Sequence, residues 1–271
     1  MKLKVFLCII LVFVNFSSAK NFMDFSYTTG DNDFNKYSFT YLFNFSTYVF
    51  SGFNYSAYDL KDVSIVSSVR FPVNILLKNA LLSIKPFYYF KKDAFKAKGI
   101  RLGARYMKGD EEKEINTVYS GFIGYANMEY ESKTLSITYA DASIEKNFYD
   151  LFFFFIRGGV RLSKEVVKWP VCYLDNLDVL SYSYSGVLSD TIHSVIGLEL
   201  ARSFKPDFNS YVYIGANRIN TYYSDVNSYS AGIKTYLDDK ENYYMDFNYN
   251  YADFKKGKDI DFWKISTGIN F

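Results

Sequence analysis

Residues 37–45 read Tyr-Ser-Phe-Thr-Tyr-Leu-Phe-Asn-Phe, and this stretch decides the fold. All five odd positions are aromatic, whereas three of the four even positions are polar. Successive side chains of a β-strand point to opposite faces, so this order gives one aromatic face and one mostly polar face. On a helix the same side chains would scatter around the axis and form no coherent apolar face. The stretch therefore predicts a strand between an apolar and a polar environment.

The same alternation recurs from one end of the chain to the other. It is clearest at 100–106, 228–237 and 242–253. Weaker runs lie at 22–29, 48–57, 63–71, 79–89, 116–130, 133–141, 149–163, 177–187, 192–203 and 210–219. Turn-forming sequences separate many of these runs, for example the Gly-Asp-Asn-Asp at 30–33. Because no domain linker or long helix interrupts the pattern, we expect a single all-β domain.

The number of strands is less clear than their existence. With a last strand at 260–271 the runs give fifteen candidates, but single-chain bacterial barrels contain an even number. When the apolar face is followed strand by strand from each end of the chain, the two assignments disagree between about 107 and 187. The aromatic run at 152–155 obscures the alternation there. The sequence predicts a closed antiparallel transmembrane β-barrel of about 14 strands, with 12 as the alternative. A soluble secreted β-sandwich is the competing fold, but 27 Tyr and 27 Phe favour the membrane barrel.

The first 19 residues have the composition of a secretory signal peptide. Lys2 and Lys4 precede an apolar segment at 5–14, and small residues lead to a cleavage site after Ala19. The apolar segment is too short for a transmembrane helix, which needs ~20 residues. The expected organisation is a signal peptide at 1–19 and a β-barrel domain at 20–271.

Charge and cysteine content narrow the possible partners. The chain has 31 Lys and Arg, and losing Lys2 and Lys4 leaves 29, which equals the 29 Asp and Glu. A neutral chain argues against a nucleic-acid partner, because phosphate binding needs a basic surplus on one face. Cys172 would be the one cysteine left after cleavage, so no disulfide is expected within the mature chain.

The last twelve residues, 260–271, form an amphipathic strand that closes on an aromatic residue. Its apolar row includes the residues Trp263, Ile265, Thr267, Ile269 and Phe271. This segment resembles the C-terminal β-signal of bacterial outer-membrane β-barrel proteins, a porin-like class. The resemblance implies that Trp263, Ile265, Ile269 and Phe271 act as an assembly signal. It also implies export to the bacterial outer membrane, with the barrel-assembly machinery and outer-membrane lipid as partners.

The sequence shows little catalytic chemistry. His193 is the only histidine, and its neighbour Ser194 would point to the opposite face of a strand. No HExxH, CxxC, phosphate-binding glycine loop or EF-hand spacing is present, so we expect no metal, no cofactor and no enzymatic activity. A lipid-modifying or proteolytic barrel built around His193 is the third possibility for function.

If the apolar rows face lipid, the opposite rows face the lumen of the barrel. The inward cations are then Lys36, Arg70, Arg101, Arg105, Arg157, Arg161, Lys234 and Lys264, and the inward acids are Asp24, Glu199 and Asp246. An excess of cations favours anions in a pore. Barrels of 12 to 14 strands fall between filled barrels and wide channels. The expected function is a narrow porin-like channel for passive diffusion of small polar or anionic solutes. A non-conducting structural or surface-interaction barrel is the alternative.

Overall fold

The computed structural model describes residues 21–31, 34–44, 49–60, 63–91, 95–110, 115–130, 133–148, 151–163, 192–205, 210–221, 225–238, 242–256 and 258–270. The predicted signal peptide, the candidate strand at 177–187, Cys172 and Phe271 lie outside these residues. Among the described residues no helix is long and apolar enough to cross a membrane.

The described residues form fifteen β-strands. They are β1 (Phe22–Gly30), β2 (Phe34–Asn44), β3 (Val49–Leu60), β4 (Val63–Arg70), β5 (Val73–Leu77), β6 (Ala80–Lys91), β7 (Phe95–Asp110), β8 (Ile115–Tyr130), β9 (Lys133–Phe148), β10 (Phe152–Ser163), β11 (Ile192–Lys205), β12 (Ser210–Thr221), β13 (Val226–Tyr236), β14 (Tyr243–Phe254) and β15 (Ile260–Asn270).

The strands pair antiparallel with their neighbours in sequence, and β1 pairs with β15, so the sheet closes on itself. Strands β4 and β5 both pair with β3 and β6. They are two halves of one barrel strand that breaks at Phe71 and Pro72, because proline has no N–H to donate to a ladder. The fifteen segments therefore make a barrel of 14 strands. The prediction of a closed 14-stranded barrel is confirmed, and the alternative of 12 is wrong.

The pairing of the strands explains why the alternating runs give an odd number. The strand at 73–77 is absent from those runs, but it adds no new position around the barrel. The run at 177–187 is among them, although β10 pairs directly with β11 along nine residue pairs. The run at 177–187 lies outside the described residues, and the described strands by themselves fill fourteen positions around the closed barrel.

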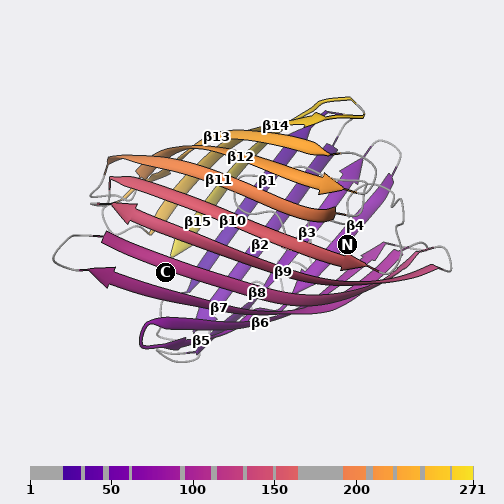
Figure 1. Cartoon of the computed structure of the whole chain (residues 1–271), viewed down its shortest axis with the longest axis horizontal. Coiled ribbons are helices and arrows are strands. Elements are labelled where there is room, and N and C mark those ends of the chain that lie inside the picture. The colour runs from indigo at the N-terminus through magenta and orange to yellow at the C-terminus, as the bar shows by residue number, and fades with distance from the viewer. Residues whose placement is uncertain are drawn as a thin grey trace.

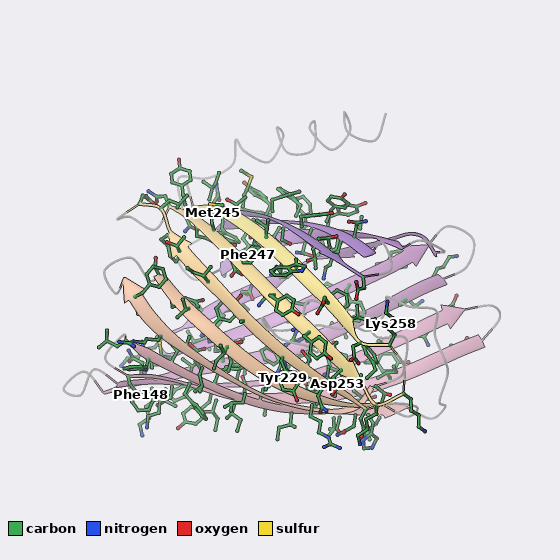
Figure 2. All side chains as sticks on the ribbon, turned by 90° about the horizontal axis from the view of Figure 1, so that it is seen from above. Phe148, Tyr229, Met245, Phe247, Asp253 and Lys258 are labelled. Atoms are coloured by element: carbon green, nitrogen blue, oxygen red, sulfur yellow. The ribbon has the colours of Figure 1, made fainter. Side chains whose placement is uncertain are left out.

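Strands of the near wall cross those of the far wall at a steep angle (Figure 1), as the tilt of a closed barrel requires. Phe22 pairs with Asn270, so the first and last described strands begin and end at the same end of the barrel, here called the terminal end. At the opposite end, here called the loop end, β10 ends at Ser163 and β11 begins at Ile192, so the longest stretch of sequence between two strands starts and finishes there. In Figure 2 Met245 and Phe148 lie toward the terminal end, and Asp253 and Lys258 lie at the loop end.

The outer wall is apolar and solvent-accessible, as the alternation predicts for a lipid-facing surface. Its central band is aliphatic and includes Ile84, Ile100, Leu102, Ile123, Ile156, Leu198, Ile214, Ile233 and Ile265. Tyr106 and Tyr119 flank the band toward the terminal end, and Tyr88 and Tyr125 flank it toward the loop end. An apolar band between two girdles of aromatic residues is the surface that transmembrane barrels present to lipid.

The stretch at 37–45 follows this pattern only in part. Tyr37 is exposed on the outer wall, but Phe39 and Tyr41 are buried. The rings of Phe39 and Tyr41 pack against Phe53 of the next strand, with centroids 5.6 and 6.4 Å away. Cross-strand aromatic pairs of this kind stabilise a sheet.

On the inner wall, large side chains lie over glycines of the adjacent strand. Tyr139 of β9 covers Gly124 of β8, and Tyr213 of β12 covers Gly232 of β13. A Cβ atom at Gly124 would overlap the ring of Tyr139, which is 2% exposed and has no room to move. The glycine is needed for this close approach.

We expect Gly124→Val to destabilise the barrel by about 1–3 kcal/mol, because the new side chain overpacks a filled interior. Gly121 lies three residues earlier on the same strand and is exposed, and a Cβ atom added there would meet no atom within 4 Å. Gly121→Val is therefore expected to be neutral or stabilising, since valine favours strands. Urea unfolding of the two refolded variants in micelles checks the difference. Equal effects would show that strand propensity, and not the ring of Tyr139, governs these positions.

Candidate solute cavity

The strand registers place the predicted inward residues on one face of the wall. Lys36 pairs with Thr28, which pairs with Lys264, and Lys234 pairs with Asp246. Arg101 and Arg105 lie on β7, Arg157 and Arg161 on β10, Glu199 on β11 and Asp24 on β1. The backbone of Arg70 pairs with Asn54 and Phe87, and its side chain lies outside the described part of the structure.

Among the side chains that the structure describes, three inward charged residues are not among those predicted from the alternation. Lys85 pairs with Arg101, Asp141 pairs with Gly159, and Glu145 pairs with Phe155. Lys85 fits the alternation of the run at 79–89 and could have been found there. Glu145 escapes because the predicted strand ends at residue 141, whereas β9 continues to Phe148. Asp141 escapes because it shares a row with Ile137 and Tyr139, apolar residues that alternation assigns to the lipid face but that are buried inside the barrel.

A cavity of about 450 Å³ lies inside the barrel, toward the terminal end. Its lining comes from strands on several sides of the barrel: Phe22, Asp24, Thr40, Arg105, Glu145, Phe153, Phe155, Glu199, Ala201, Tyr211, Tyr213, Lys234, Tyr244, Asp246, Lys264 and Ser266. This volume falls within the ~300–1,000 Å³ of typical small-molecule sites.

One side of the cavity is a network of tyrosines, carboxylates and lysines on β1 and β12–β15. The hydroxyl of Tyr244 donates to Asp24, and the hydroxyl of Tyr213 donates to Asp246 over 3.0 Å. The ammonium group of Lys234 lies 4.6 Å from the ring centroid of Tyr244. Hydrogen bonds and cation–π contacts hold these charged groups in place.

Across the barrel, the lining is formed by β7 and β9–β11. Arg105 and Glu145 form an ion pair with 3.3 Å between nitrogen and oxygen, and both side chains are exposed to the cavity. Glu199 adds a second carboxylate, and Phe155 lies between the two acids, in register with both. Phe153 follows on the same row, two residues toward the terminal end. Counting each group as ionised, the cavity has three cations and four carboxylates, a net charge of −1. The inward cations are therefore not gathered at the cavity.

Three of the inward arginines are instead buried in the interior wall. The guanidinium of Arg101 lies 3.9 Å from the ring centroid of Phe122, and Arg157 donates to Asn217 over 2.5 Å. Arg161 donates to Asp141 over 2.8 Å and to the carbonyl oxygen of Val160 over 2.8 Å. All three side chains are less than 10% exposed. These buried arginines link strands of the wall: Arg101 and Arg161 contact an adjacent strand, and Arg157 reaches past β11 to β12.

The interior toward the loop end is filled by buried side chains. Ile137, Tyr139, Ile219 and Phe262 lie on inward positions there and are 0–2% exposed. The described interior is thus open at one half and packed at the other.

The remaining predicted residues lie away from the cavity. Trp263 and Ile265 are 45% and 49% exposed on the outer wall, and Ile269 pairs with Met23 and Tyr243. His193 is exposed at a β-bulge of β11 near the loop end. No group of three or more His, Cys, Asp or Glu side chains that could hold a metal occurs among the described residues.

At the loop end, outside the strands, Asp225 forms ion pairs with two basic residues. Lys255 lies 2.7 Å and Arg218 3.3 Å from its carboxylate. The hydrogen bond from Lys255 and the positive charges lower the pKa of Asp225 below its usual value. This cluster ties the β12–β13 connection to the end of β14.

No family model matches the chain, and no curated protein matches it in sequence. Solved structures are similar to it: OccAB1 of Acinetobacter baumannii has a TM-score of 0.53 at 7% identity, covering 93% of this chain and 95% of that chain. OccAB3 of the same organism has a TM-score of 0.52 at 7% identity, covering 93% and 98%. A bacterial polysaccharide outer membrane secretin has a TM-score of 0.52 at 9% identity, also covering 93% and 98%. The fold is that of an outer-membrane β-barrel. At sequence identities this low, the similarity shows the fold alone. That fold confirms the β-barrel class that the C-terminal strand resembles.

Proposed function

We propose that this outer-membrane barrel is a narrow channel for passive diffusion of small polar or anionic solutes. The observation that carries the proposal is the cavity inside the barrel, lined by seven charged side chains and six aromatic rings. A barrel that served only as a scaffold would gain stability from filling this space with apolar side chains. Seven charged groups in the interior are costly unless water or a polar solute occupies the space between them.

The cavity lining bears on selectivity. Opposite charges alternate along β13 to β1, where Lys234, Asp246, Lys264 and Asp24 follow one another across four strands. A lining with three cations and four carboxylates attracts neither sign strongly. We therefore expect anions to be accepted without being strongly preferred over cations.

A non-conducting structural or surface-interaction barrel is the second candidate. It is favoured by the packed interior of the loop end, where Tyr139 and Phe262 are each 2% exposed. Such packing also fits a channel that is narrow at one end, so conduction is the property that separates the two candidates.

Single-channel recording in a planar bilayer tests the proposal directly. The refolded full-length mature chain is added to one side, and heat-modifiability on a gel confirms that it is folded. Discrete current steps are expected, with a zero-current potential close to zero in a salt gradient. His193→Ala, which leaves the cavity unchanged, is expected to conduct like the parent protein. A folded barrel that never conducts would reject the channel and favour the structural role.

The assembly role of the last strand is a separate part of the proposal. The row formed by Trp263, Ile265, Ile269 and Phe271 would be recognised by the barrel-assembly machinery during insertion. The exposure of Trp263 and Ile265 on the outer wall supports this role, because a recognised row must be accessible before the barrel closes.

A further inference from the structure

The outer wall carries an apolar groove of about 590 Å³ near the terminal end. It crosses β9 to β12, and the outward residues that line it are Phe148, Phe152, Phe154, Leu200, Arg202, Val212 and Ile214. The inward residues Phe153, Ala201 and Tyr213 also line it, and these three line the interior cavity as well. Phe152, Leu200, Val212 and Ile214 are 45–59% exposed. The groove is thus open to the membrane and is shaped by aromatic and aliphatic side chains.

Two cations flank this groove. Arg202 lies in register with Phe152, and its guanidinium is 5.6 Å from the ring centroid of Phe152. Lys146 lies in register with Phe154, and its ammonium group is 4.9 Å from the ring centroid of Phe148. Given a strand spacing of ~4.8 Å, the two residues are roughly 12 Å apart across β10. Both charged ends can therefore reach one anionic group seated above the groove.

The charge of this wall is segregated by face. On β9 to β12 the carboxylates Asp141, Glu145 and Glu199 all occupy inward positions. None of the outward side chains that the structure describes on these four strands is an acid. The outer surface around Lys146 and Arg202 is therefore complementary to a negatively charged partner.

We propose that this groove is a binding site for one anionic phospholipid. An acyl chain lies in the groove between Phe154 and Ile214, and Arg202 and Lys146 hold the phosphate. Both cations stand within three residues of the terminal ends of their strands, at the level where lipid head groups begin. Longer connections on transmembrane barrels are extracellular. The terminal end is thus the periplasmic one, and the leaflet there consists of phospholipid.

Native mass spectrometry of the refolded chain tests this site. The barrel is released from vesicles of equal phosphatidylglycerol and phosphatidylcholine with identical acyl chains, and the retained lipid is identified. One phosphatidylglycerol is expected to be retained in preference to phosphatidylcholine. A basic side chain near an anionic lipid contributes about fivefold, so Lys146→Gln/Arg202→Gln is expected to lower this preference about 25-fold.

The matched control uses lysines on the same outer wall at the opposite end. Lys96 and Lys98 are exposed outward residues of β7 near the loop end, and Lys96→Gln/Lys98→Gln is expected to keep the preference. If both double variants lost the preference for phosphatidylglycerol equally, the preference would come from the net charge of the protein, and the site would be rejected. No preference in the parent protein would reject it as well. If the variant with Arg202→Gln does not refold, Lys146→Gln alone is tested instead, and its preference for phosphatidylglycerol is expected to fall about fivefold. The result does not depend on whether the barrel conducts.

Discussion

Replacing Arg161 with methionine is expected to destabilise the barrel by about 3–5 kcal/mol, the cost of breaking a buried ion pair from one side. The side chain of Arg161 is 2% exposed and that of its partner Asp141 is 14% exposed. The variant removes a 2.8 Å ion pair and leaves the carboxylate in the interior wall without this cation. Urea unfolding in detergent micelles, followed by tryptophan fluorescence, measures the change.

Two further variants separate this ion pair from a general effect of removing arginine. Arg161→Met/Asp141→Leu replaces both charges with apolar groups and is expected to recover most of the lost stability. Arg105→Met removes one partner of an exposed ion pair with Glu145, where the side chains are 49% and 36% exposed, and is expected to cost only about 0–1 kcal/mol. Similar losses in Arg161→Met and Arg105→Met would contradict the role assigned to burial.

Reversing the charge of both lysines that line the cavity is expected to make the channel strongly cation-selective. Lys234→Glu/Lys264→Glu changes the lining by four negative charges, from −1 to −5. A ring of carboxylates attracts cations and excludes anions from a narrow pore. In a tenfold KCl gradient the zero-current potential is expected to move from near zero toward the ideal limit of about 59 mV, by at least about 30 mV.

The control for this prediction lies on the outer wall. Lys96→Glu/Lys98→Glu changes the charge of the protein equally but places it outside the lumen, and the potential is expected to stay near zero. If the cavity variant conducts with unchanged selectivity, the permeating ions do not pass through this cavity. A parent protein with strong anion preference would instead show that the buried arginines, and not the cavity lining, set the selectivity.

Much of the fold follows from local sequence. Because the side-chain period of a strand is two, residues such as Ile100, Leu102 and Tyr106 can be assigned to the outer wall from their own strand alone. The strand at 73–77 escapes prediction because it has only five residues and the consecutive Leu76 and Leu77 break its alternation. Only its pairing with β3 and β6 shows that it continues β4.

The candidate site was predictable only in part. Alternation places Asp24, Lys234, Asp246 and Lys264 on the inner face, and the structure brings all four to one cavity. Alternation could not predict the buried contact between Arg161 and Asp141, because that contact depends on the register between β9 and β10.

The sequence by itself determined the class of the protein and, outside the region 107–187, the two faces of its wall, because those depend on the order of polar and apolar side chains along each strand. Only the tertiary structure decided which inward side chains are packed into the wall and which line an open cavity. The registers between strands place Tyr139 over Gly124, bury three arginines in the wall, and leave a cavity of nearly balanced charge at the terminal end. Side chains meet across strands at positions far apart in the chain, and a shift of one residue in any register would send them to the opposite face.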